Sequence, residues 1–123
     1  MKITNKDFGV YKTEVVKWIN SFGLNGWDFD FKIDGKDKDS LSTLRWNNEG
    51  RNCTFTINRD WGNNEISEEN IKKSALHEVL HLIFSKATHL ADKRFADKHS
   101  LEEAWEEAVN TLVNYFFKDG RNK

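Results

Sequence analysis

Apolar residues recur along this chain at two spacings, and the change between them marks out its elements. From Lys6 to Ser21 the apolar side chains return every three or four positions, which predicts an amphipathic helix. Thr4 or Asn5 is suited to cap its first turn, because a short polar side chain can accept a hydrogen bond from a free backbone N–H group. The predicted buried face comprises Phe8, Tyr11, Val15, Trp18, Ile19 and Phe22.

The spacing of apolar residues changes to two from Trp27 to Ile33, where large apolar side chains alternate with Asp and Lys. This alternation is typical of a half-buried strand. Two further strands are predicted over Leu41–Trp46 and about Asn52–Asn58, separated by a turn at residues 47–50. The three segments predict a small sheet of about three strands that contains antiparallel pairs.

A strongly apolar helix is predicted from Ile71 to Phe84, a segment without Gly or Pro. Ser67 is its expected N-cap, and acidic residues follow in the first turn, where the helix dipole favours them. At 100° per residue the polar side chains fall on one narrow stripe, which suggests that the helix is deeply buried. That stripe comprises Ser74, His77, Glu78, His81 and Ser85.

The C-terminal part of the chain predicts a loop followed by a last helix. The apolar helix is expected to fade around residues 86–89, and residues 88–99 are polar and irregular. A capping box at residues 100–103 then opens a helix that ends at Gly120. The order of helix, small sheet, helix, loop and helix predicts an α+β fold, and residues 1–123 are expected to form a single domain.

Composition excludes some classes of partner. The formal net charge is -1, with Lys+Arg 19 against Asp+Glu 20, so nothing favours nucleic acid or an anionic membrane as a partner. No segment approaches the roughly 20 apolar residues of a membrane span, and the polar N-terminus lacks the apolar core of a signal peptide. The lone Cys53 is expected to be a buried strand residue in a reducing compartment. We therefore expect a cytoplasmic protein.

The candidate chemistry lies in His77-Glu78-Val79-Leu80-His81, an HExxH pattern within the apolar helix. Two imidazoles one helical turn apart can bind one zinc ion, and the intervening carboxylate can act on a water at the metal. Chance produces this pattern in such a chain with a probability of about one in a hundred. Buried histidines this close together need a shared partner, and a single Zn²⁺ supplies one.

Zinc requires a third protein ligand, and a catalytic site leaves the fourth position open. A metzincin would continue with glycine at position 84 and histidine at 87, where this chain has Phe84 and Ala87, so that class is excluded. The residues themselves leave several candidates open: His89, Asp92, Asp97, His99, Glu102, Glu103, Glu106 and Glu107.

The segment HEVLHLIF, followed after a loop by EEAWEEAVNTLVNYF, resembles the gluzincin arrangement, in which a Glu on the next helix completes HExxH. The match is closest to small phage- and prophage-type metallopeptidases, over roughly residues 54–117. The resemblance implies that Glu106 is the third ligand, with Asn110 one turn later positioned to hydrogen-bond a ligating histidine. It also implies that Thr54, Thr56 and Asn58 lie on the strand that pairs with a peptide substrate.

These patterns lead us to expect a zinc-dependent metallopeptidase with a zincin-like fold, acting on a peptide or protein with Glu78 as general base. Two alternatives remain open at this point. One is a non-catalytic binding or regulatory module in which zinc is structural. The other is a protease similar to the SprT-like class, with His99 as the third ligand. An intact Glu78 favours an enzyme, because a structural site has no use for that acid.

Overall fold

The computed structural model describes residues 1–34, 40–92 and, in the C-terminal part, 102, 103, 106, 107, 109, 110, 112, 113, 116 and 117. Five elements have defined bounds: α1 (Asn5–Ser21), β1 (Asp28–Asp34), β2 (Ser42–Asn47), β3 (Asn52–Asn58) and α2 (Glu68–Asp92). Every described residue from 102 to 117 is helical. The predicted α+β class is therefore confirmed.

Helix α1 begins where its sequence provides a reciprocal cap. The Thr4 hydroxyl accepts a hydrogen bond from the Asp7 amide at 3.1 Å, and the Asp7 carboxylate accepts one from the Thr4 amide at 2.9 Å. The two bonds satisfy amide groups that have no partner within the helix. Along the apolar face of α1, Tyr11, Val15 and Ile19 are buried, as their spacing predicted.

The sheet has the strand order β1-β3-β2, so β3 lies in the middle. Strands β2 and β3 are antiparallel, which confirms the expected antiparallel pairing, whereas β1 and β3 are parallel, so the sheet is mixed. The chain runs from β1 to the far edge at β2 and returns between them, so β1 and β3 point the same way. The centre suits β3 because Cys53, Phe55 and Ile57 are all buried on its inner face.

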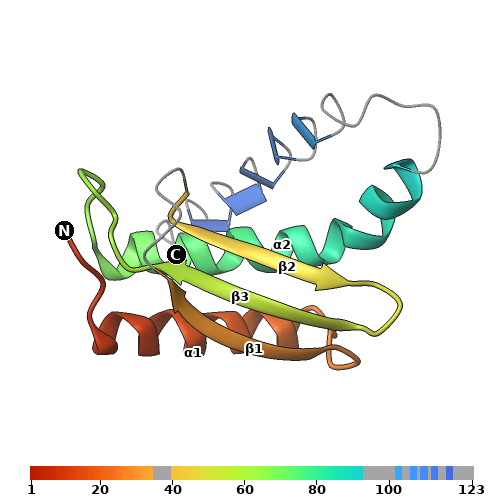
Figure 1. Ribbon diagram of the computed structural model, residues 1–123, viewed down its shortest axis with the longest axis horizontal. Helices are drawn as coiled ribbons and strands as arrows, with labels where there is room; N and C mark the ends of the chain where they lie inside the picture. Colours follow the sequence, from red (N-terminus) through yellow and green to blue (C-terminus); the bar gives the residue numbers. More distant parts are fainter. Residues whose placement is uncertain are drawn as a thin grey trace.

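Both helices cover one face of the sheet, with α1 and α2 side by side behind it (Figure 1). The inner faces of the strands and the apolar faces of the two helices form one hydrophobic core. The buried members of this core are Ile3, Tyr11, Val15, Ile19, Cys53, Phe55, Ile57, Trp61, Ile71, Ala75, Val79 and Leu82. The domain thus has two layers, and α2 is positioned by the sheet on one side.

A second apolar cluster positions α2 on its other side. Leu76 and Leu80, one turn apart on α2, pack against Val109 and Val113, which are spaced in the same way in the C-terminal helical residues. Helix α2 itself continues to Asp92, so the expected fading at residues 86–89 is wrong. The polar composition there suggested a loop, but the segment contains no Gly or Pro to interrupt a helix. Residues 93–101 lie outside the described residues.

The burial of Cys53 leads to a prediction about its reactivity. Burial, followed by the nearby negative charge of Asp30, raises the pKa of the Cys53 thiol from 9.0 to about 11. Because only the thiolate reacts with alkylating agents, two pKa units reduce the reactive fraction at pH 8 by about 100-fold. We expect iodoacetamide to label Cys53 at least about 100-fold more slowly in the native protein than in urea. Equal rates would show that the thiol is exposed.

Candidate metal centre

The two histidines of α2 are brought together by helix geometry and held by packing on both sides. His77 and His81 lie one turn apart, and their Nε2 atoms are 3.2 Å from each other. Val79 and Leu82 bury one side of the helix in the main core, while Leu76 and Leu80 bury another against the C-terminal residues. The polar stripe therefore faces the space between β2 and the C-terminal helical residues, and both imidazoles are about one-fifth exposed.

Glu106 belongs to the C-terminal helical residues that pack against Leu76 and Leu80, and it contacts both histidines. Its Oε1 lies 2.7 Å from Nε2 of His77, and its Oε2 lies 2.8 Å from Nε2 of His81. Its side chain is 48% exposed. A single carboxylate thus bridges both rings. The structure places the residue that the resemblance nominated against both predicted histidine ligands.

The three groups fit a zinc ion. Zinc–nitrogen bonds of about 2.0–2.1 Å at tetrahedral angles place two ligating nitrogens about 3.3 Å apart, and the imidazole nitrogens are 3.2 Å apart. The Glu106 oxygens lie about half an ångström too close to the nitrogens for co-ligands of one ion. The half-exposed Glu106 side chain has room to withdraw by that amount. Two imidazoles and one carboxylate are also a donor set that catalytic zinc sites use.

Glu78 lies beside this cluster but is held differently. Its side chain is 5% exposed, and its Oε2 accepts a hydrogen bond of 2.7 Å from the Ser42 hydroxyl on β2. The ligand atoms of His77, Glu78 and His81 all lie within 4.8 Å of one another, so this group could hold a metal ion. Burial raises the pKa of Glu78 to about 8; the Ser42 hydrogen bond lowers it and the charge of Glu106 raises it.

The environment of His77 favours the neutral ring that metals bind. Burial lowers the pKa of His77, the charge of Glu106 opposes this, and the charge of His81 lowers it further. Hydrogen bonds that the His77 ring donates to Glu106 and Asn110 also raise its pKa. Asn110 is therefore close enough to His77 to orient its ring, which is the contact expected of a residue supporting a metal ligand.

Two adjoining cavities open on this cluster. One, of about 420 Å³, is bordered by His77, Glu78, Glu106 and Asn110 and extends towards the start of α2. The other, of about 380 Å³, is bordered by His77, Glu78, His81 and Glu106 and extends along β2. Ser42 borders both cavities. A molecule bound in either cavity would lie against the predicted ligands and Glu78.

Strand β3 cannot pair with a peptide substrate through its main chain, so that expectation is corrected. Its residues pair with β1 along one side and with β2 along the other, over Asn52–Asn58 and Asn52–Ile57 respectively. A strand paired on both sides has no backbone groups left for a further strand. The edges of the sheet in the described residues are β1 and β2.

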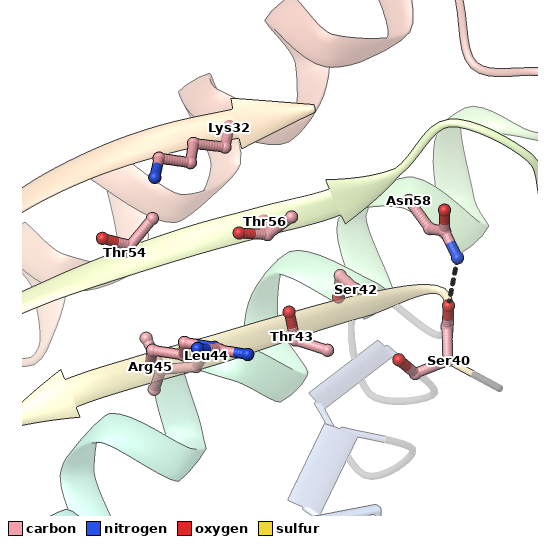
Figure 2. A pocket seen from close by; sticks show the side chains of 9 residues that line it. All are labelled: Lys32, Ser40, Ser42, Thr43, Leu44, Arg45, Thr54, Thr56 and Asn58. Carbon is pink, nitrogen blue, oxygen red and sulfur yellow. Dashed lines mark hydrogen bonds between the residues drawn. The ribbon is translucent and has the colours of Figure 1, made fainter. Parts of the chain in front are cut away.

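The side chains nominated on β3 lie away from the histidines. Thr54, Thr56 and Asn58 border a separate cavity of about 540 Å³ together with Lys32 and Arg45. Figure 2 shows these side chains on one face of the sheet, and the apolar residues that alternate with them pack against the helices. The structure therefore does not bring the three residues to the candidate metal centre.

The structure adds Ser42 to the residues of the candidate site, although the sequence did not single it out. Some of the candidate ligands lie outside the described residues. The only available indication of Ser42 was a small polar residue on the same strand face as Leu44 and Trp46. Among the alternatives, Glu102 borders the cavity along β2. The side chains of His89 and Asp92, and residues 97 and 99, lie outside what the structure describes.

Comparison with known proteins adds no relative. No protein-family model matches the chain, and no curated protein or solved structure is significantly similar to it. Within the part of the chain that the structure describes, no helix is long and apolar enough to cross a membrane. The assignment of a function thus rests on the geometry of the site.

The bridging position of Glu106 generates a prediction about metal affinity. Replacing Glu106 with Ala removes a ligand, which should cost more than the 10- to 100-fold typical of losing an outer-sphere partner. Glu107→Ala, the same change at the neighbouring exposed helical position, should leave zinc affinity unchanged. Competition with a chromophoric chelator measures both variants beside the wild type. Equal affinities for wild type and Glu106→Ala would remove Glu106 from the ligand set.

Zinc should also stabilise the folded protein, because the site forms only when α2 and the C-terminal residues are packed. At free zinc of about 100 times Kd, the free energy of unfolding should rise by about 2.7 kcal/mol and Tm by about 10 °C. Calorimetry with and without EDTA measures the shift. A His77→Ala, His81→Ala double variant provides the control and should show no shift.

Proposed function

We propose that this chain is a zinc-dependent metallopeptidase with a zincin-like fold, and that peptides or proteins are its substrates. One observation carries the proposal: a carboxylate from a separate segment contacts both histidines of an HExxH helix, at 2.7 and 2.8 Å. HExxH arises by chance at a rate of about one in a hundred. Chance does not also bring Glu106 to both Nε2 atoms, with a buried glutamate beside them.

In this proposal His77, His81 and Glu106 hold the ion, and Asn110 orients the His77 ring. When bound, zinc supplies the Lewis acidity that makes a water nucleophilic near neutral pH and polarises a carbonyl. The carboxylate of Glu78 accepts the proton of the attacking water and delivers it to the leaving amine. A cation beside Glu78 favours its ionised form, which counteracts the effect of burial on its pKa.

Strand β2 is the edge at which an extended peptide would bind. The Asn58 amide donates to the Leu41 carbonyl at 2.8 Å, which makes these two residues a hydrogen-bonded pair. Because such pairs alternate in antiparallel strands, the N–H and C=O groups of Ser42, Leu44 and Trp46 face away from β3. No described strand pairs with this edge. A peptide added there would lie along the cavity that contains the histidines.

A structural zinc site is the second candidate function. It is favoured by the burial of Glu78, whose carboxylate already has a hydrogen-bond partner without a substrate. Against it, Glu78 borders both cavities that open on the histidines, where a substrate carbonyl would have to lie. In either case the unpaired thiol of Cys53 accords with the cytoplasm as the site of action.

Replacing Glu78 with Gln separates the two functions. The proposal predicts that the zinc-loaded wild type cleaves unfolded casein or a mixed peptide library, with products identified by mass spectrometry. Glu78→Gln keeps the size of the side chain but cannot accept the proton, so the rate should fall about 10²- to 10⁴-fold. Zinc stoichiometry should stay the same.

The matched control for this experiment is Glu103→Gln, an equivalent change at an exposed helical position. It should cleave at the wild-type rate. Hydrolysis that persists in Glu78→Gln would contradict the role of Glu78. One tightly bound zinc ion with no cleavage of any peptide in the library would favour the structural alternative.

A further inference from the structure

Ser42 connects the edge strand to the buried glutamate through a chain of hydroxyl groups. Its Oγ lies 2.7 Å from Oε2 of Glu78 and 3.2 Å from Oγ of Ser74, which precedes Glu78 by one helical turn. A hydroxyl has one proton to donate, and Ser42 donates it to the carboxylate. Ser74 therefore donates to Ser42. The two serines form an ordered chain that ends on Glu78.

Ser42 and Glu78 are both buried, and a buried polar group without a hydrogen-bond partner is destabilising. Ser42 is 8% exposed, and Tyr11, whose pKa both Ser42 and Glu78 affect, is fully buried. Burial, followed by the charge of Glu78, raises the pKa of Tyr11 well above 10.0. A short hydrogen bond to a buried carboxylate holds that acceptor firmly, because breaking the bond leaves a buried charged group without its partner. The Ser42 bond therefore restricts where the Glu78 carboxylate can point.

Glu78 needs such a restriction because it lies within reach of the metal position. Its carboxylate and the two histidine nitrogens lie within 4.8 Å of one another, so a small rotation of the side chain would make it a ligand. A carboxylate bound to zinc no longer serves as a free base and also fills a coordination position that a catalytic site keeps open. Keeping Glu78 near the ion but unbound is thus a requirement of the proposed chemistry.

We propose that Ser42 is a positioning residue whose hydroxyl holds the Glu78 carboxylate beside the zinc position and outside the ligand set. The inference rests on the proposed zinc site and names a residue on which its open coordination position depends. Ser42 also belongs to β2, the edge strand, where its main-chain groups face away from β3 and would face a peptide added to that edge. The same residue would therefore align the substrate strand and the base that acts on it.

The inference predicts an unusual sign for the effect of Ser42→Ala on metal affinity. Without the hydroxyl, Glu78 is free to join the ligands, so zinc should bind more tightly, on the order of tenfold. A purely structural role for Ser42 predicts the opposite, because loosening the site weakens metal binding. Cobalt-substituted protein reports the ligand set directly, because the position and intensity of its visible absorption change when a carboxylate enters the open coordination position.

The experiment compares Ser42→Ala, Ser42→Thr and the double variant Ser42→Ala, Glu78→Gln with the wild type and with Glu78→Gln. Ser42→Thr keeps the hydroxyl and should retain the wild-type cobalt spectrum and affinity. In the double variant the changes should disappear, because the amide of Gln is a much poorer ligand. Ser85→Ala is the matched control, since Ser85 is also buried and hydrogen-bonds to Asn48 at 3.3 Å.

Each result decides between the possibilities. If the wild type binds no stoichiometric zinc, the proposed function fails and the role of Ser42 fails with it. If the wild type binds zinc but Ser42→Ala shows an unchanged or weaker affinity with an unchanged cobalt spectrum, only the role of Ser42 is overturned. Should circular dichroism show that Ser42→Ala is unfolded, Ser42→Val replaces it. Val differs from Thr only by a methyl group in place of the hydroxyl.

Discussion

The packing of Val109 and Val113 on Leu76 and Leu80 is the constraint on which the candidate site depends. These four apolar side chains set the position of the C-terminal residues along α2. The Glu106 carboxylate reaches both imidazoles as a consequence. Both histidines come from α2, whereas Glu106 comes from a separate segment. Only tertiary packing brings that carboxylate to the histidines. Hydrophobic burial is non-directional, yet here it fixes the position of a polar group to within hydrogen-bonding distance.

The second constraint is the cost of burying Glu78 on the opposite side of the histidines. A buried carboxylate without partners would be strongly unfavourable as an anion, and the raised pKa of about 8 expresses that cost. The Ser42 hydroxyl offsets part of it. The site thus has a half-exposed acid, Glu106, that contacts both histidines, and an enclosed acid, Glu78, that is hydrogen-bonded by Ser42. In the proposed mechanism, this difference in environment favours a ligand role for Glu106 and a proton-transfer role for Glu78.

The local features of this fold were predictable because they depend on neighbouring residues. Thr4 as a cap and the bounds of β3 follow from side-chain chemistry and alternation over a few positions. Alternation shows which face of a strand is buried but not which strand lies beside it. The parallel pairing of β1 with β3 was therefore missed. The limit of α2 was misjudged for a related reason, since polar composition indicates exposure and does not end a helix.

The same distinction between local spacing and tertiary contacts applies to the candidate site. His77, Glu78 and His81 are recognisable because one helical turn relates them, and Glu106 was nominated by resemblance to a spacing seen elsewhere. Ser42 had no such pattern, because its partner is separated from it by 36 positions in the chain. Its contact arises from the strand order: β3 occupies the centre, so β2 is placed at the edge and against α2. The strand order, which the sequence did not predict, thus makes β2 both an edge of the sheet and the strand that contacts Glu78. Any peptide bound along that edge must therefore pass the histidine cluster.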